Sequence, residues 1–132
     1  MSRICVDTSA YSHFRRGHEP AVSALTGAKS VFVPAIVVGE LRAGFRIGRH
    51  RKENDRVLGE FLAASVVEVL DVDAEAAEIY ADLVVDLRDR GTPLPTNDIW
   101  IAAVAIREGA TVVTYDAHFA AMRRVGVLML KA

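Results

Sequence analysis

Short apolar runs of strand length alternate along this chain with longer segments of helical periodicity. Parallel neighbouring strands need a crossover of a dozen or more residues between them, and these helical segments can supply it. The runs carry few polar residues, which is typical of strands covered on both faces. The pattern therefore predicts an α/β fold, a three-layer α/β/α domain with a five-stranded parallel sheet. Its five strands are expected at residues 4–6, 31–33, 66–70, 111–114 and 127–130.

Capping residues set the bounds of the expected helices. The hydroxyl of Thr8 or Ser9 is expected to cap the first helix, because either oxygen can accept a bond from a free backbone amide. Pro34 is expected in the first turn of the third helix, where its missing N–H costs nothing. Asp73 is expected to cap the most regular amphipathic helix, whose acids all fall on one face. The expected helices cover residues 8–16, 21–25, 34 to 44 or 48, 52–64, 74–90, 98–108 and 118–123.

The segment 98–108 differs from the other helical segments because it is apolar on nearly every side. This composition is typical of a helix buried in the core, and Trp100 is expected to be part of that core. Thr96 or Asn97 is expected to cap the helix at its start.

Composition indicates a single domain spanning residues 1–132. The chain is 52% apolar and long enough to bury a substantial core. Its formal net charge is −1, so any attraction to a polyanion must come from a local patch. Cys5 is the only cysteine, and no apolar run reaches the roughly 18–20 residues that a membrane helix needs. We therefore expect a soluble protein of the reducing cytoplasm, with no membrane partner.

Two segments concentrate charge of opposite sign. Residues 42–56 hold six Arg or Lys residues against two acids, and residues 68–89 hold eight acids against one arginine. The acidic segment is mostly the solvent face of the predicted amphipathic helix and needs no other explanation. The basic segment is either a solvated helix end or a surface for phosphate or a partner.

Four carboxylates stand at the junctions of the predicted strands and helices: Asp7, Glu40, Asp98 and Asp116. Each has an ordinary interpretation by itself, as a helix cap, a turn residue or a helix-surface acid. Ligands of open parallel sheets, however, bind beyond the carboxyl ends of the strands, where Asp7 and Asp116 are expected. If the fold brings the four together, their mutual repulsion favours a hard divalent cation such as Mg²⁺ or Mn²⁺.

Other kinds of site lack support in the sequence. The four histidines form no i, i+4 pair and have no cysteine partners, which argues against structural zinc. There is no phosphate-binding glycine loop and no dinucleotide fingerprint after the first strand. Ser9 lacks the context of a nucleophile elbow, and the aromatic residues are too scattered to predict a base-stacking surface.

Four segments in this order resemble the PIN domain, and more narrowly the VapC-type toxin nucleases. They are Val6-Asp7-Thr8-Ser9, residues 34–41 around Glu40, residues 97–105 around Asp98, and Thr114-Tyr115-Asp116-Ala117-His118-Phe119. The resemblance covers essentially the whole chain. It implies a five-stranded parallel sheet with the acids at one edge, and RNA cleavage that depends on Mg²⁺ or Mn²⁺.

The resemblance also implies roles for individual residues. Asp7, Glu40, Asp98 and Asp116 would form the catalytic pocket. Asp7 and Asp98 would contact the metal directly, while the other two acids would act through water or hold a second ion. The hydroxyls of Thr8 and Thr114 would bond to the carboxylates or to water on the metal.

An RNA substrate and an antitoxin protein that inhibits the nuclease are implied by the same resemblance, and the Ala-, Val- and Leu-rich helices with a near-neutral charge also fit a homodimer. The antitoxin would dock along the early helices, in an apolar groove between residues 8–16 and 35–47. In the basic segment, Arg42, Arg46 and Arg49, with Arg51 and Lys52, are candidates to contact RNA phosphates.

Two other functions stay open. A receiver-type phosphoacceptor domain has a similar size and alternation of strands and helices, with Asp71 as acceptor and Lys131 after the last strand. It leaves Glu40, Asp98 and Asp116 unexplained. The second alternative is a PIN-like binding module without catalytic activity, against which the presence of all four acids argues.

Overall fold

The central sheet has five parallel strands in the order β3-β2-β1-β4-β5. The computed structural model describes residues 3–132, so the first two residues of the predicted domain lie outside the described part. The prediction of a five-stranded parallel sheet is confirmed, with strand bounds within one residue of those expected from the sequence. The strands are β1 Arg3–Val6, β2 Ser30–Pro34, β3 Val67–Leu70, β4 Thr111–Thr114 and β5 Val127–Met129.

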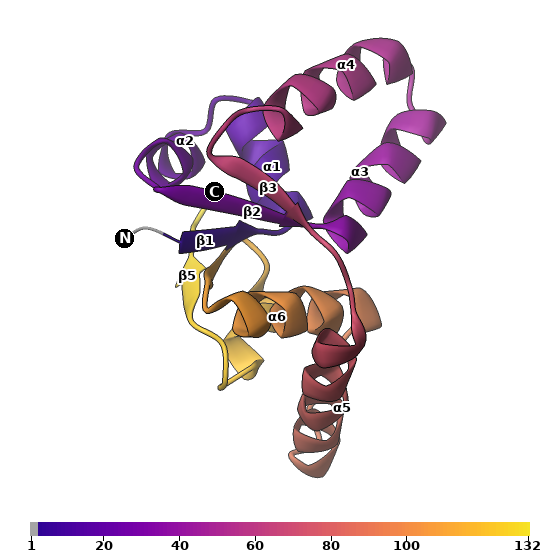
Figure 1. Cartoon of the computed structure of the whole chain (residues 1–132), viewed down its shortest axis with the longest axis vertical. Helices are drawn as coiled ribbons and strands as arrows, with labels where there is room; N and C mark the ends of the chain where they lie inside the picture. The colour runs from indigo at the N-terminus through magenta and orange to yellow at the C-terminus, as the bar shows by residue number, and fades with distance from the viewer. Residues whose placement is uncertain (1–2) are drawn as a thin grey trace.

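Helices cover both faces of this sheet and make the molecule a three-layer α/β/α structure (Figure 1). The first four helices lie on one side, and the last two lie on the other (Figure 1). The first group is α1 Thr8–Arg15, α2 Glu19–Thr26, α3 Ala35–Ile47 and α4 Arg51–Leu62. The second group is α5 Ala74–Asp89 and α6 Thr96–Glu108, and a 3₁₀ turn, η1 Ala117–Ala121, precedes β5.

The three inner strands are buried, whereas the two edge strands are partly exposed. Cys5, Val33 and Val112 are fully buried in β1, β2 and β4. In the edge strands Val69 is 39% exposed and Leu128 is 41% exposed. The prediction that apolar strands are buried on both faces is therefore correct only for strands that have a neighbouring strand on each side.

Several helix starts differ from those expected. Asp7, and not Thr8 or Ser9, caps α1, because its extended backbone aims the carboxylate at the Ala10 N–H. Pro34 ends β2 and is the residue before α3 instead of a member of its first turn. Asp7 is the single residue between β1 and α1, and no residue lies between β2 and α3, so neither junction has a longer loop.

The start of α6 also lies earlier than predicted. Pro95 is the capping residue, and Thr96 and Asn97 are helical, so neither of them is a cap. Proline fixes its own φ near −60° and disfavours the helical conformation of the residue before it, which places the boundary here. Asp98 thus stands in the first turn of α6. The predicted helix at 118–123 is the 3₁₀ turn η1, which begins after Asp116.

Helices α5 and α6 form the layer opposite α1–α4. Asp73 caps α5 through the Ala76 N–H, as predicted. The buried side chains of α5 include Leu83 and Leu87, and α6 buries six residues of its apolar surface. Gly109 ends α6 with φ +67°, a left-handed conformation that favours glycine. Among residues 3–132, no helix has both the length and the apolar character needed to cross a bilayer.

Candidate active site

The carboxyl ends of β1 and β4 bring Asp7 and Asp116 to one edge of the sheet. The two strands pair in parallel with Val6 opposite Val113, so the residues that follow them emerge side by side. Asp7 comes directly after β1, and its N–H donates to the Val113 carbonyl at 3.4 Å. Asp116 lies two residues beyond β4, where its Oδ1 accepts from the His118 N–H at 2.9 Å and caps η1. The sheet therefore juxtaposes two acids that are far apart in the sequence.

Asp7 is a buried carboxylate, only 4% exposed, that is held by three donors. Its Oδ1 accepts from the Ser9 hydroxyl and from the Ala10 N–H, both at 2.8 Å. Its Oδ2 accepts from the Thr114 hydroxyl at 2.5 Å. Burial raises the pKa of Asp7 above its ordinary value, the hydrogen bonds oppose that rise, and the nearby charge of Asp116 adds to it. A cation placed nearby would favour the charged form of this group.

Hydroxyl groups connect the two strand ends. Thr114, which is fully buried, donates to Asp7 and accepts from the Asp116 N–H at 2.8 Å. The Ser9 hydroxyl donates to Asp7 and accepts from the Tyr115 N–H at 2.9 Å. The position of Asp116 relative to Asp7 is thus fixed by backbone and side-chain hydrogen bonds together.

Asp98 joins this edge from the first turn of α6. The Nδ1 atom of His118 lies 3.0 Å from Asp98 Oδ2 and 3.2 Å from Asp116 Oδ1. One donor atom from each of these three residues lies within 4.8 Å of the other two. Burial is the largest cause that raises the pKa of Asp98, the charges of Asp116 and Asp7 add to it, and the bond with His118 lowers it. Three of the four predicted acids therefore act on one another electrostatically.

Glu40, the fourth acid, is tied to the residues beside two of the others. Its Oε1 accepts from the Thr8 hydroxyl at 2.6 Å, and its Oε2 accepts from the Asn97 side-chain amide at 3.1 Å. Thr8 follows Asp7 in the chain, and Asn97 precedes Asp98. Glu40 therefore belongs to the same region, although it lies outside the group formed by Asp98, Asp116 and His118. The two hydroxyls predicted to support the acids lie against carboxylates, Thr8 against Glu40 and Thr114 against Asp7.

The basic residues proposed for RNA contact lie farther along α3 and in the loop after it. Arg42 forms an ion pair with Asp55 at 2.9 Å, and Arg51 lies 3.5 Å from the same carboxylate. Arg46 and Arg49 are exposed, and neither forms an ion pair with another residue of the part that is described. Among the described residues, Arg42 and Arg51 are thus paired with an acid, whereas Arg46 and Arg49 are exposed and form no ion pair.

Three residues contact the acids although the sequence did not indicate that role for them: His118, Ser9 and Asn97. The spacing Asp116-Ala117-His118 is a usable signal, because an aspartate that caps a turn binds the N–H two residues later and so holds that residue beside it. Ser9 and Asn97 flank acids, but serine and asparagine beside a helix start suggest only a capping role.

An aromatic cluster adjoins the hydroxyl network. The ring of His13 stacks on that of Tyr115 with centroids 3.8 Å apart. His18 Nδ1 lies 2.6 Å from the Tyr115 hydroxyl, and His13 Nδ1 lies 2.9 Å from the Ser9 carbonyl oxygen. No sequence pattern indicates this cluster, because about a hundred residues separate Tyr115 from the histidines.

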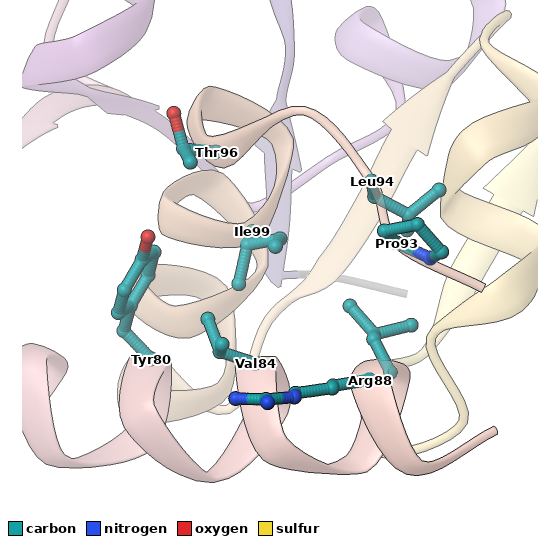
Figure 2. Close-up of a pocket in the computed structure, with 8 residues that line it drawn as sticks. Tyr80, Val84, Arg88, Pro93, Leu94, Thr96 and Ile99 are labelled. Carbon is teal, nitrogen blue, oxygen red and sulfur yellow. The ribbon is translucent and has the colours of Figure 1, made fainter. Parts of the chain in front are cut away.

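An apolar hollow lies away from the carboxylates. It has a volume of about 380 Å³ and lies between α5, α6 and the loop before α6. Val84 and Ile99 point toward each other across it, and Pro93 and Leu94 close one end (Figure 2). None of its lining residues is acidic, so it offers no carboxylate to a hard cation.

A second hollow, of about 300 Å³, lies between α1, α3 and α4, where the antitoxin groove was predicted. It is less apolar than predicted, because its lining includes the polar side chains of Ser12, Arg15, Arg16 and Asn54. The apolar part consists of Tyr11, Leu41 and Phe45.

The residues at the sheet edge fit a divalent cation. Asp98 and Asp116 offer carboxylate oxygens close together, His118 offers a nitrogen, and Asp7 adds a further negative charge beside them. Carboxylates suit Mg²⁺ and Mn²⁺, and the side chains of His118 and Asp116 reach solvent, being 48% and 39% exposed. Such a site can hold a phosphate against a cation.

Comparison with known proteins gives a consistent result at the level of the family. The family model of the PIN domain matches residues 4–125. A relative from Mycobacterium tuberculosis strain H37Rv, Ribonuclease VapC4, is 35% identical over 98 residues, which cover 74% of this chain and 75% of the relative.

Solved structures show the same fold over nearly the whole chain. VapBC2 from Rickettsia felis, bound to a DNA fragment from its promoter, superposes with a TM-score of 0.83 at 25% identity and covers 95% of this chain and 96% of the other. VapBC-5 of the VapBC family of toxin–antitoxin systems, from Mycobacterium tuberculosis, superposes with a TM-score of 0.76 at 30% identity and covers 96% and 97%.

Proposed function

This chain belongs to the PIN-domain family and to its VapC ribonucleases, and we propose that it is a metal-dependent endoribonuclease, the toxin of a toxin–antitoxin pair. The observation that carries the proposal is the convergence of Asp7, Asp98 and Asp116 at one edge of the sheet, with Glu40 tied to their neighbours. The shared core of residues 3–132 supports the prediction of a single nuclease domain.

Asp98 and Asp116 would hold the cation, which we take to be Mg²⁺ or Mn²⁺. When bound, the cation supplies positive charge for the phosphate and lowers the pKa of an attacking water. Within residues 3–132, Oδ2 of Asp7, which was predicted to contact the metal, accepts a single hydrogen bond and so retains a lone pair. Thr114 and Ser9 orient Asp7, while Thr8 and Asn97 orient Glu40.

RNA would approach the acids over the surface that carries Arg46 and Arg49. Because both side chains are exposed and without an ion pair among residues 3–132, they can contact phosphates without first losing a partner. Arg42 is already bonded to Asp55, so we assign it a smaller part in RNA binding than the sequence suggested.

The proposed antitoxin would occupy the hollow between α1, α3 and α4. The similar solved structures are VapBC2 and VapBC-5, the latter a member of the VapBC family of toxin–antitoxin systems, which supports a protein partner. The mixed lining favours a segment that offers apolar side chains to Leu41 and Phe45 and an acid to Arg15 or Arg16. Homodimer formation and a cytoplasmic location stay predictions.

The receiver-type alternative loses support from the topology. Asp71 follows the edge strand β3, which two strands separate from β4 and Asp116. Its backbone carbonyl accepts from Arg107, so the chain after β3 is engaged in a contact between layers. A phosphoacceptor at Asp71 would leave the acids beside β1 and β4 without a role.

Sequencing the 5′ ends of RNA after brief expression in cells tests the proposal. Wild-type protein should create new ends at defined positions, and Asp98→Asn should create none. The Arg56→Gln variant, which alters an exposed residue paired with Glu53 and Glu60, is the matched control and should leave the same ends as wild type. Identical ends from wild type and Asp98→Asn would contradict the assignment.

A further inference from the structure

We propose that His118 supplies a nitrogen ligand to the cation, so that the site prefers Mn²⁺ to Mg²⁺. This inference rests on the proposed metal-dependent function and goes beyond it, because the four acids alone would offer only oxygen. It concerns a residue that lies outside the predicted set of acids.

The geometry of His118 carries the inference. A single atom, Nδ1, lies 3.0 Å from Asp98 Oδ2 and 3.2 Å from Asp116 Oδ1. The nitrogen therefore faces both carboxylates that would hold the cation, and the three donor atoms lie within 4.8 Å of one another. A cation between the carboxylates would have this nitrogen within its reach.

The surrounding turn holds His118 at this place. Its N–H donates to Asp116 Oδ1 at 2.9 Å, which ties its backbone to one of the acids. The next residue, Phe119, is fully buried and anchors η1 in the core. The His118 side chain itself is 48% exposed, so burial in the core does not account for its orientation toward the acids.

The other described histidines behave differently. His13 faces the Ser9 carbonyl and His18 faces the Tyr115 hydroxyl. His50 is exposed at the start of α4 and makes no side-chain cap bond there. Within residues 3–132, only His118 has a ring nitrogen within bonding distance of a carboxylate.

An imidazole ligand changes which ion is bound best. Mg²⁺ is a hard ion that takes oxygen ligands in a strict octahedron, so a nitrogen adds little to its binding. First-row transition ions accept imidazole as well as carboxylate, and Mn²⁺ is the member of that series whose preference for oxygen is closest to Mg²⁺. A set of two carboxylates and one imidazole therefore discriminates in favour of Mn²⁺.

Pulsed electron paramagnetic resonance of protein loaded with Mn²⁺, without RNA, tests the ligand directly. Wild type should show a ¹⁴N coupling from a directly bound nitrogen, His118→Asn should lose it, and the matched control His50→Asn should keep it. Circular dichroism and thermal unfolding verify that both variants are folded. A Mn²⁺ spectrum without ¹⁴N coupling in wild type would overturn the inference.

Calorimetric titration with Mn²⁺ and Mg²⁺ alone supplies the second measurement. In His118→Asn, Mn²⁺ affinity should fall by about tenfold or more while Mg²⁺ affinity changes less, so the ratio of the two Kd values moves toward one. An unchanged ratio would overturn the inference and leave the proposed nuclease intact. If neither ion bound to wild type in a manner sensitive to Asp98→Asn, both the inference and the proposed metal site would fail.

Discussion

Thr114 shows how much of the site depends on one small side chain. Its hydroxyl is fully buried, donates to the Asp7 carboxylate and accepts from the Asp116 N–H. Burial raises the pKa of Asp7, and the hydrogen bond from Thr114 is the strongest influence that opposes this rise. The hydroxyl thus favours the charged form of one acid and holds the backbone of another.

The substitution Thr114→Val should therefore impair both folding and cleavage. It keeps the shape of the side chain but leaves a buried carboxylate without one donor, at a cost of about 1–3 kcal/mol in the free energy of unfolding. We expect cleavage to fall by roughly 10–100-fold, as for other residues that orient metal ligands. Urea denaturation and single-turnover assays check this.

Thr111→Val, at the other end of the same strand, is the matched control. The Thr111 hydroxyl makes no side-chain hydrogen bond within residues 3–132, and the residue is half-buried. Equal losses of stability and activity in the two variants would show that the Thr114 hydroxyl has no special role.

At Asp98 the charge that the proposed function requires destabilises the folded, metal-free protein. Its pKa is raised by burial and by the charges of Asp116 and Asp7, so the folded metal-free protein binds its proton more tightly than the unfolded chain does. Stability from this group is complete below the unfolded pKa and is lost as pH rises through the folded pKa. Asp98→Asn should then abolish cleavage yet raise the unfolding midpoint by roughly 2–4 °C at neutral pH in chelator.

The gain should shrink as pH falls through the raised pKa of Asp98 toward the ordinary range of aspartate, because wild type then loses the charge as well. Thermal unfolding of both proteins from pH 4 to 8 measures it. A variant less stable than wild type across this range would contradict the stated origin of the raised pKa.

At the scale of elements, the sequence predicted the strands and most helices but not every boundary. Apolar runs identified β1 and β4, and hence the place of Asp7 and Asp116, because the pattern depends on burial alone. The start of α6 was wrong because Thr96 and Asn97 resemble caps, whereas Pro95 sets the boundary. The role of Asn97 in holding Glu40 depends on a contact between helices that no local pattern encodes.

Burial in the layer formed by α5 and α6 predicts which substitutions there destabilise the protein. Leu83 of α5 is 1% exposed in the core, whereas Val85 two residues later is 56% exposed. Leu83→Ala should cost about 2–5 kcal/mol, because it removes buried methyl groups and leaves a cavity. Val85→Ala should change stability by less than about 0.5 kcal/mol. Denaturant unfolding of both variants checks this, and a similar effect of the two would contradict the burial seen here.

At the scale of the whole molecule, charge is distributed unevenly. The formal net charge is −1, so RNA affinity must depend on a local patch rather than on an overall field. The acids repel phosphate in the absence of a cation, and the exposed arginines lie beyond them on α3 and the following loop. The fold could be predicted from the sequence because burial patterns specify it. The sequence could not show which arginines lack an ion pair, because this depends on pairings such as that of Arg42 with Asp55.

Replacing Arg46 and Arg49 together by glutamine should weaken RNA binding in a salt-dependent manner. Loss of two phosphate contacts on a single strand should reduce the slope of log K against log salt by about 1.4. Fluorescence anisotropy in the Asp98→Asn background, over a salt series, measures the slope without cleavage. Arg56→Gln is the control, and an equal slope for the double variant and the control would exclude the patch from RNA binding.

The central claim is that acids from separate segments hold one cation that cleavage requires. Single-turnover cleavage of a radiolabelled RNA, with and without excess chelator, tests it most directly. We predict that chelator abolishes cleavage, that Mg²⁺ or Mn²⁺ restores it, and that circular dichroism shows the fold unchanged throughout. Cleavage at the full rate in excess chelator would contradict the account.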